Sequence, residues 1–196
     1  MLWLLRHGET DANAARIVQR PEVALSARGR EQAERLARRL ADGRVAHVVS
    51  SDLRRAVETA EAIVRATGAS LELDPCLRER DFGDVRGTAY AALAEDIFGP
   101  DYAPPNGETW AAFHVRVDAA WRGVLARAAT TPGDLVVVTH GLVVGAVVRR
   151  HCDLPPGTEV PLAWPNTAVT LVEPPRTLAL LGCTAHLVAP AEGGAA

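Results

Sequence analysis

Two histidines follow predicted strands in the same way, and this repetition is the strongest chemical signal in the sequence. The segments LLRHG at 4–8 and VVTHG at 137–141 each run from apolar residues into a His-Gly pair. In an open parallel sheet, ligands bind outside the carboxyl ends of the strands, so we expect His7 and His140 to face one crevice. We also expect the glycines that follow them, Gly8 and Gly141, to let a ligand approach the backbone closely.

A pair of imidazoles could hold a metal or supply a nucleophile. A zinc site needs further ligands at a usable spacing, and the sequence has no H-E-x-x-H motif and no C-x-x-C pair. The segment 151–153 (HCD) has suitable residue types, but it is predicted to end a buried helix. None of the four serines lies in G-x-S-x-G, so serine hydrolase chemistry is not indicated. A covalent histidine nucleophile remains, with metal catalysis as the weaker alternative.

The basic residues indicate which group such a nucleophile would attack. All 21 are arginines, and the missing lysine excludes P-loop, kinase-type and pyridoxal Schiff-base chemistry. Arg6 adjoins His7, and Arg55 lies in the first turn of a predicted helix, where free backbone amides already favour an anion. Guanidinium groups bind phosphate oxygens bidentately, so these two residues could hold a phosphoryl group during its transfer.

The composition is that of one soluble globular domain. The chain has 196 residues, 48% hydrophobic and 23% charged, with a formal net charge of -3. This charge gives no general attraction to nucleic acid or to an anionic membrane, so we expect neither as a partner. Three cysteines without a C-x-x-C pair fit a reducing compartment, and no apolar run is long enough for a membrane span. We therefore expect a cytoplasmic protein.

Strand-like and helix-like segments alternate along the chain. Apolar runs of strand length occupy 2–5, 45–49, 135–138, 168–172 and 178–181, and helical patterns fill 110–128 and 142–148. Two further helices are predicted to begin after capping residues, one after Ser26 and one after 50–52 (SSD). The helix after Ser26 should bury one apolar stripe, while its other face carries Glu31, Glu34, Arg35 and Arg38 as a solvated face with weak ion pairs. The alternation predicts an α/β domain with a mainly parallel sheet.

Two segments do not follow the alternation of strands and helices. Residues from about 82 to 108 are rich in glycine and proline and are predicted to form a cap or insertion near the site. Residues 189–196 consist mainly of alanine and glycine and are predicted to be a flexible tail. We therefore expect one domain over 1–188 that contains the cap.

Several motifs in the sequence resemble those of a known family. Arg6-His7-Gly8-Glu9-Thr10 with Asn13 resembles the R-H-G-[EQ]-[ST]-x-x-N signature of the histidine phosphatase superfamily, which includes the cofactor-dependent phosphoglycerate mutases. Further blocks follow in the family's order: Leu25-Ser26 with Gly29, Gln32 and Ala33; Ser51-x-Leu53-x-Arg55-Ala56-x-x-Thr59-Ala60; Leu77-x-Glu79-Arg80-x-Phe82-Gly83 with Gly87; Gly107-Glu108-Thr109; and Thr139-His140-Gly141. The resemblance covers most of the chain and implies a three-layer sandwich with helices on both faces of the sheet.

The resemblance also implies a role for each matching residue. His7 would take the phosphoryl group as a phosphohistidine, while Arg6, Arg55 and His140 hold its oxygens. Glu79 would protonate the leaving oxygen and then activate water. Without the resemblance, an isolated loop glutamate would be read as solvated. The phosphate pocket would be completed by Asn13, Thr10, Gly8 and Gly141, and no metal or organic cofactor is implied.

The acceptor of the phosphoryl group separates the members of this family. Water as acceptor gives a phosphatase, and a second phosphorylated substrate gives a mutase. The mutases carry a lysine and paired arginines in the insertion after the glutamate block, whereas residues 87–105 hold no basic residue here, which favours a phosphatase for a small phosphomonoester. Arg20 and Arg80 could add positive charge around the pocket for a further anionic group. A mutase, a non-catalytic phospho-ligand-binding protein and a homodimeric assembly are left open, and a phosphatase would release inorganic phosphate.

Overall fold

The computed structural model describes residues 1–188, and six strands form one mixed sheet there. The strands are β1 (Leu2–Arg6), β2 (Val45–Ser50), β3 (Ser70–Leu73), β4 (Asp134–Thr139), β5 (Val169–Glu173) and β6 (Thr177–Cys183). Their order is β3-β2-β4-β1-β5-β6, with the first four parallel and the last two added antiparallel. The predicted α/β class with a mostly parallel sheet is confirmed. The tail predicted at 189–196 lies outside the described residues.

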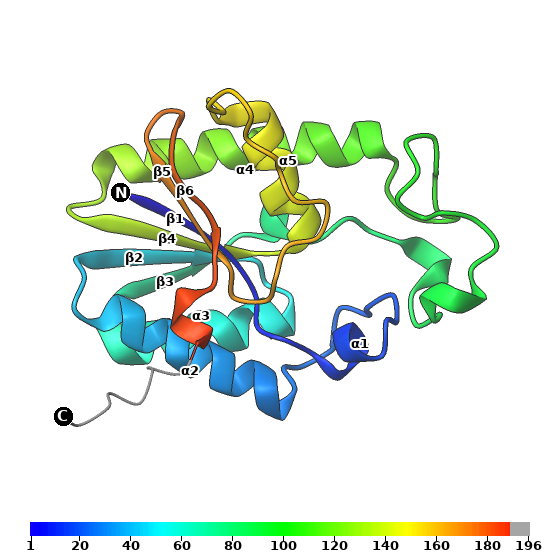
Figure 1. The fold of residues 1–196 in the computed structure, drawn as a ribbon, viewed down its shortest axis with the longest axis horizontal. Coiled ribbons are helices and arrows are strands. Elements are labelled where there is room, and N and C mark those ends of the chain that lie inside the picture. The colour runs from blue at the N-terminus through cyan, green and yellow to red at the C-terminus, as the bar shows by residue number, and fades with distance from the viewer. Residues whose placement is uncertain (189–196) are drawn as a thin grey trace.

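Helices cover both faces of this sheet, as Figure 1 shows. The helices are α1 (Asp11–Ala14), α2 (Ala27–Ala41), α3 (Arg54–Thr67), α4 (Trp110–Thr130) and α5 (Gly141–His151), with short 3₁₀ turns η1 (Pro75–Leu77), η2 (Gly83–Val85), η3 (Tyr90–Ala92) and η4 (Ala185–Leu187). The pair α2 and α3 packs on one face, and α4 and α5 pack on the other. No helix among the described residues is long and apolar enough to cross a membrane.

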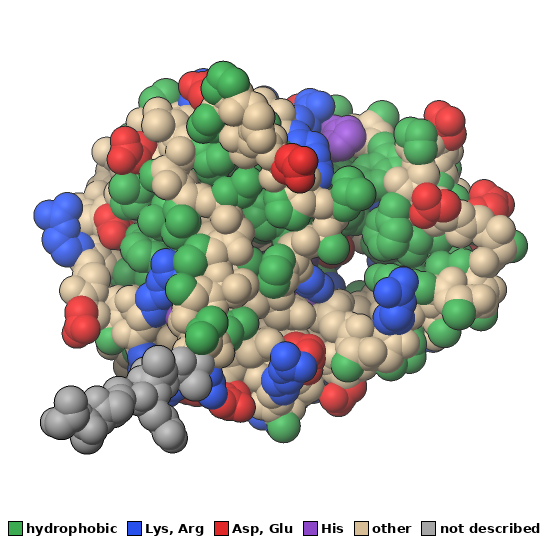
Figure 2. Space-filling model, viewed as in Figure 1, with side chains coloured by type: hydrophobic (Ala, Val, Ile, Leu, Met, Phe, Trp, Pro, Cys, Tyr) green, Lys and Arg blue, Asp and Glu red, His purple; other side chains and the backbone are tan. Residues whose placement is uncertain are grey.

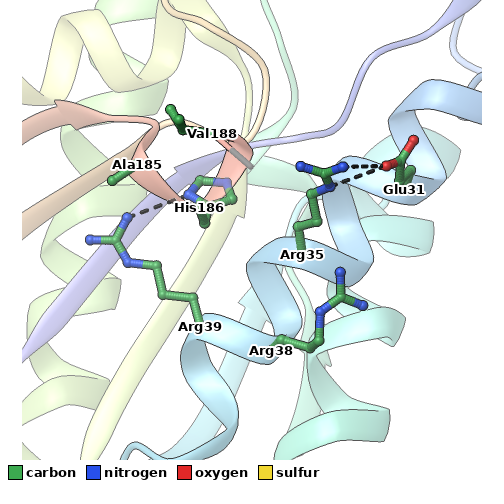
Figure 3. Close-up of a pocket in the computed structure, with 7 residues that line it drawn as sticks. All are labelled: Glu31, Arg35, Arg38, Arg39, Ala185, His186 and Val188. Carbon is green, nitrogen blue, oxygen red and sulfur yellow. Dashed lines mark hydrogen bonds and ion pairs between the residues drawn. The ribbon is translucent and has the colours of Figure 1, made fainter. Parts of the chain in front are cut away.

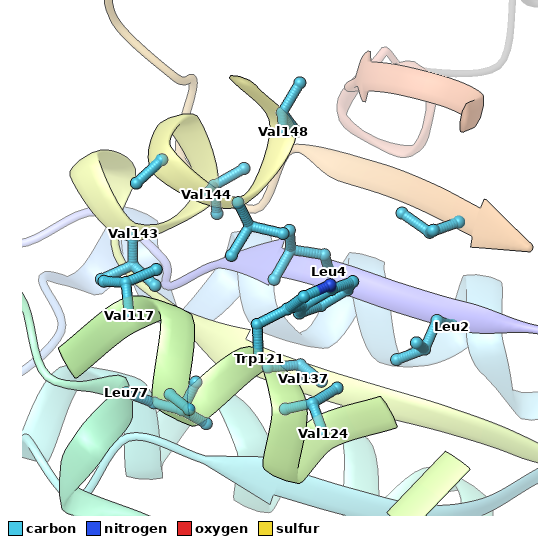
Figure 4. Close-up of a cluster of buried hydrophobic side chains, with 14 of the residues drawn as sticks. Leu2, Leu4, Leu77, Val117, Trp121, Val124, Val137, Val143, Val144 and Val148 are labelled. Atoms are coloured by element: carbon cyan, nitrogen blue, oxygen red, sulfur yellow. The ribbon is translucent and has the colours of Figure 1, made fainter. Parts of the chain in front are cut away.

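The central strand β4 shows why the sheet needs both helical layers. Successive side chains of a strand point to opposite faces, and every residue from Leu135 to Val138 is buried. Leu135 and Val137 join the cluster with α4 and α5, drawn in Figure 4, where Trp121 fills the space between helix and sheet. Val136 and Val138 join the cluster with α2 and α3. The continuous apolar run in the sequence therefore encodes two cores.

The helix starts were predicted with mixed success. Ser26 caps α2 as expected, because its hydroxyl oxygen accepts a hydrogen bond from the Gly29 amide at 2.9 Å. The expected cap of α3 within 50–52 was wrong: the cap position is Leu53, and no side chain caps the helix. The Ser51 hydroxyl oxygen accepts a hydrogen bond from the Leu53 amide at 3.3 Å, and the same hydroxyl lies 2.8 Å from His140 Nε2.

The edge strand β3 was not predicted, and its composition explains the omission. Its four residues, SLEL, alternate too briefly to form an apolar run, and Leu71 and Leu73 are exposed. It forms because its backbone extends the sheet beside β2, with His47 opposite Ser70. Strand formation at an edge depends on the neighbouring strand more than on local sequence.

The residues from 82 to 108, here called the cap segment, contain η2 and η3 and lie beyond the carboxyl ends of β1, β2 and β4 (Figure 1). Phe82 and Ile97 are buried with Val18 in a small cluster of their own. Backbone hydrogen bonds tie the cap segment to the loop after α1: the Gly87 amide donates to the Val18 carbonyl at 2.7 Å, and the Tyr90 amide donates to Arg16 at 2.8 Å. Figure 2 shows a hollow between the cap segment and the rest of the molecule, with hydrophobic side chains along its cap side.

Candidate active site

The two strand-end histidines meet at the carboxyl edge of the sheet. β1 and β4 are parallel neighbours with Arg6 opposite Thr139, so the next residue of each strand emerges at the same level. The rings of His7 and His140 lie with their centroids 5.1 Å apart and tilted by 60°. Both residues are almost fully buried. The structure therefore brings together the two side chains that the repeated strand-His-Gly pattern singles out.

His7 has a free ring nitrogen that is suited to nucleophilic attack. Its Nδ1 lies 2.6 Å from the Gly8 carbonyl oxygen, which can only accept, so the ring proton is on Nδ1 and the lone pair on Nε2. Burial, together with the charges of Arg55 and Arg6, lowers the pKa of His7 well below 6.5. A neutral imidazole with this tautomer can attack phosphorus without first losing a proton.

The orientation of His140 is set by Ser51. The His140 Nε2 lies 2.8 Å from the Ser51 hydroxyl oxygen, which also accepts the Leu53 amide. The Ser51 proton has no other acceptor among the described residues, so it points to Nε2 and leaves the imidazole proton on Nδ1. This Nδ1 is buried and has no hydrogen-bond partner in the described part of the chain. His140 Nδ1 is therefore a hydrogen-bond donor that is available to a ligand in the crevice.

Two arginines supply positive charge beside these rings. Arg55 is only 3% exposed and donates from Nη1 to the Arg20 carbonyl at 3.2 Å, while Arg6 donates from Nη1 to the Trp164 carbonyl. The Nε atoms of both are buried without a partner among residues 1–188, and no carboxylate of that range forms an ion pair with either. Burial lowers the pKa of Arg55 to about 10, so it stays charged at neutral pH. Unpaired buried cations of this kind favour a bound anion.

Glu79 lies in the same electrostatic environment and has the properties of a proton donor. Its two carboxyl oxygens accept the backbone amides of Arg80 and Leu142, each at 3.1 Å. Burial raises the pKa of Glu79 above its ordinary value, and this effect outweighs the two amides and the charges of Arg55 and Arg6. A carboxyl group with a raised pKa retains its proton closer to neutrality, as a general acid must.

Asn13 and Thr10 shape the loop beneath His7. The Thr10 hydroxyl caps α1, accepting the Asn13 amide at 3.0 Å and donating to Gln19 at 2.9 Å. The Asn13 side-chain oxygen accepts hydrogen bonds from the Thr10 amide and from Asn166, both at 3.3 Å. The Asn13 amide group makes no hydrogen bond as a donor within the described residues, so it could bind a phosphate oxygen. Thr10 has its hydroxyl fully engaged and positions the loop.

The two glycines have different reasons for being glycine. A Cβ at Gly8 would lie 2.5 Å from the Gly29 carbonyl oxygen, so Gly8 is required by packing against α2. This packing is a second reason for glycine at position 8, and the close approach of a ligand there stays a prediction. A Cβ at Gly141 would lie 3.7 Å from the unpartnered Nε of Arg6, an ordinary contact on the crevice side. Close approach of a ligand remains the better explanation for Gly141.

Arg80 and Arg20 are placed differently from Arg6 and Arg55. The Arg80 guanidinium is buried and donates to the carbonyl oxygens of Glu108, Ile97 and Tyr102 at 2.9, 3.2 and 2.6 Å. It also lies 3.9 Å from the centre of the Trp110 ring. These contacts hold the cap segment against α4, and they do not favour the substrate contact predicted for Arg80. Arg20 is exposed, with its guanidinium against Gly87 and its carbonyl on Arg55.

The sequence assigned no role to the residues that hold the His7 end of β1 in place, although Thr59 belongs to one of the family's blocks. Thr59 on α3 accepts the Gly8 amide at 3.1 Å, and Asn166 donates to the His7 carbonyl at 3.1 Å. The Thr167 amide donates to the carbonyls of Arg6 and His7 although its φ is 55°, a strained value for a β-branched residue. The segment 164–167 carries no motif, so only the tertiary structure reveals its function.

A metal centre finds no support in the described residues, where no group of three or more His, Cys, Asp and Glu side chains could hold an ion. The segment 151–153 ends α5, and His151 binds Asp118 at 2.8 Å.

Comparisons with known proteins identify the family of the chain. The family model described as histidine phosphatase superfamily (branch 1) matches residues 2–179. A probable phosphoglycerate mutase GpmB of Enterobacter sp. (strain 638) is 31% identical over 210 residues, which cover 97% of this chain and 96% of that protein.

Two solved structures resemble most of the chain. YhfR of Bacillus stearothermophilus is 29% identical with a TM-score of 0.83, and the match covers 95% of this chain and 98% of that one. A mycobacterial glucosyl-3-phosphoglycerate phosphatase is 29% identical with a TM-score of 0.72, covering 86% and 88% of the two chains. The chain therefore belongs to branch 1 of the histidine phosphatase superfamily.

Proposed function

We propose that this chain hydrolyses a small phosphomonoester through a phosphohistidine on His7. The observation that carries the proposal is the set of buried donors that lack partners within the described residues, namely Arg6 Nε, Arg55 Nε and His140 Nδ1, beside a neutral histidine with a free Nε2. Three donors and two unpaired charges fit the oxygens of a phosphoryl group, which spread the developing charge during transfer.

The first step transfers the phosphoryl group to the protein. The lone pair on His7 Nε2 forms a bond to phosphorus while the bond from phosphorus to the ester oxygen breaks. Glu79 gives its proton to that oxygen, so an alcohol leaves and the carboxylate remains. Arg6, Arg55 and His140 hold the three oxygens that do not react.

The second step regenerates the free protein. The Glu79 carboxylate takes a proton from water, and the water oxygen attacks phosphorus as the bond to His7 Nε2 breaks. Inorganic phosphate leaves, and Glu79 again carries its proton. No metal or organic cofactor enters either step.

Water is favoured as the acceptor by the cap segment. Its residues 87–105 contain no lysine or arginine, and its buried cluster is apolar. A mutase must hold a second phosphorylated substrate in the orientation for transfer, and positive charge on the cap would assist this. The second candidate is nevertheless phosphoglycerate mutation, because relatives such as GpmB are named probable phosphoglycerate mutases.

Hydrolysis of p-nitrophenyl phosphate without added metal tests the proposal. We expect turnover that His7→Ala abolishes and that a chelator leaves unchanged. Absence of turnover would indicate a phospho-ligand-binding protein, and loss of activity with a chelator would restore the metal alternative.

A second assay of the same protein distinguishes water from a phosphorylated substrate as the acceptor of the phosphoryl group. With 3-phosphoglycerate as substrate, we expect release of inorganic phosphate to exceed formation of the isomer. Dominant isomer formation would make the chain a mutase.

A further inference from the structure

A second basic pocket lies between α2 and η4, and its His186 bonds Thr167, whose backbone amide donates to the His7 carbonyl. It has a volume of about 740 Å³ and is lined by Glu31, Arg35, Arg38, Arg39, Ala185, His186 and Val188. Figure 3 shows the three arginines of α2 that line the pocket, with Arg39 directed toward His186 and Arg35 toward Glu31. A volume of this size lies within the range of small-molecule sites. Nothing in the proposed hydrolysis uses it.

The charge of this pocket is positive and only partly compensated. Arg35 binds Glu31 through Nη2 at 2.6 Å, the single carboxylate of the lining. Arg38 is exposed and has no hydrogen bond or ion pair among residues 1–188. Arg39 donates only to neutral atoms, the Cys183 sulfur at 3.3 Å and His186 Nδ1 at 3.4 Å. Two guanidinium groups therefore face the pocket without an anion, in a chain whose net charge is -3.

The wall opposite α2 is held in one arrangement by hydrogen bonds. His186 accepts from Arg39 at Nδ1, so its proton is on Nε2 and donates to the Thr167 hydroxyl oxygen at 3.0 Å. The Thr167 hydroxyl in turn donates to the Asn166 carbonyl at 2.7 Å. Burial and the charges of Arg39 and Arg35 lower the pKa of His186 to about 4, so it is neutral at pH 7. Because these side chains are already held in place, less conformational entropy is lost when a ligand binds.

From these contacts we propose that the pocket between α2 and η4 binds a small oxyanion with at least two negative charges, as carried by phosphate or carboxylate groups. Guanidinium forks match both groups, and two uncompensated cations favour a dianion over a monoanion. The apolar side chains of Ala185 and Val188 would contact the carbon skeleton of an organic ligand. The lining of this pocket shares no residue with the phosphoryl-transfer centre, and its occupancy does not depend on the proposed hydrolysis.

Nuclear magnetic resonance with citrate as the carboxylate probe and pyrophosphate as the phosphate probe tests this site. At constant ionic strength, we expect saturable shifts of the backbone amides of Ala185, His186 and Leu187. Binding by only one probe would identify the preferred oxyanion. Shifts confined to Gly8 and Gly141 would place the probe in the catalytic crevice and overturn the proposal, as would the absence of saturable shifts.

Matched variants localise the binding. Arg38→Gln should weaken probe binding on the order of tenfold, since one charged hydrogen-bond donor is lost. Arg39→Gln should weaken it similarly. Arg122→Gln removes an exposed arginine of α4 outside the pocket and should leave binding unchanged. Equal affinity in all three variants would contradict the proposal.

The chain's own Glu192 lies outside the described residues and is the one alternative occupant to exclude. A variant that ends at Val188 should bind citrate or pyrophosphate as the full chain does. Binding that appears only in the shortened chain would show that residues 189–196 occupy the pocket, and the proposal of a free ligand would be wrong.

Discussion

At the scale of single residues, the site depends on charges that the protein leaves uncompensated. Arg55 is buried and charged, yet its hydrogen-bond acceptor among the described residues is the Arg20 backbone carbonyl and not a carboxylate. Arg54, its neighbour, is exposed and pairs with Glu58 at 2.8 Å. Two adjacent arginines thus have opposite environments, and only one of them can act on a buried phosphoryl group.

This contrast gives the first prediction. Arg55→Ala should lower kcat by on the order of a hundredfold or more, because it removes a preorganised charge from the transition state. Arg54→Ala should leave kcat near the unmodified value. The measurement is steady-state hydrolysis of p-nitrophenyl phosphate by both variants. Similar rates for the two variants would show that Arg55 does not contact the phosphoryl group.

Glu79 leads to a prediction about leaving groups. Glu79→Gln keeps the shape but cannot give a proton, so it should impair hydrolysis of alkyl phosphates far more than that of p-nitrophenyl phosphate. The p-nitrophenolate ion leaves without protonation, whereas an alkoxide does not. The measurement is the ratio of kcat/KM of variant to unmodified protein on the two substrates, because kcat/KM reports formation of the phosphohistidine and not its later attack by water. Equal losses on both would remove Glu79 from the role of general acid.

His7 leads to a prediction about pH. Its lowered pKa means that the free imidazole stays neutral as the pH falls through 6.5, and it gains its proton only below that value. Added phosphate should move the transition upward, since a nearby negative charge favours the protonated ring. Nitrogen NMR of labelled histidine measures both. A ligand-free His7 that titrates at 6.5 or higher would contradict the assigned environment.

At the scale of elements, an ion-pair cluster joins the two helices behind the sheet. Asp118 of α4 binds Arg150 at 2.6 Å and His151 at 2.8 Å, both from α5. The Arg150 hydrogen bond lowers the pKa of Asp118 to about 2, with a smaller contribution from His151. A lowered carboxyl pKa stabilises the fold above the ordinary value of 3.8, and this stabilisation is lost as the pH falls toward 2.

Asp118→Asn should therefore lower the free energy of unfolding by about 1 kcal/mol near neutral pH, allowing for solvent screening of this partly exposed cluster. The difference from the unmodified protein should shrink as the pH falls below 3.8. Asp153→Asn, which removes a more exposed pair with Arg176, should have a smaller effect. Urea unfolding at two pH values makes the comparison, and a constant difference at both would refute the linkage.

At the scale of the whole molecule, the sequence was informative where one local pattern determines the position of a residue. The strand-His-Gly repeats place His7 and His140 at one edge of the sheet, because parallel neighbours end together. The apolar runs and the Ser26 cap likewise predict their strands and α2 from local patterns. Glu79 was found only through the family resemblance, since nothing in its loop distinguishes it from a solvated carboxylate.

Other features depend on contacts between distant segments, which a single sequence does not display. Ser51 orients His140 from 89 positions away, and Asn166 contacts His7 across 159 positions. The α2 face was predicted to be solvated, and its Glu31–Arg35 pair agrees, but Glu34 binds Arg65 of α3 instead of Arg38. Arg38 is consequently left to line the second basic pocket.

The proposed reaction requires a covalent intermediate, and trapping it is the most direct test. The Glu79→Gln variant should form the intermediate from p-nitrophenyl phosphate but hydrolyse it slowly, because water activation is lost. A rapid alkaline quench preserves phosphohistidine, and mass spectrometry of the digested protein locates the phosphoryl group. We predict a phosphoryl group on the peptide that contains His7 and none in His7→Ala. An unmodified His7 during turnover, or a phosphoryl group on another residue, would contradict the mechanism.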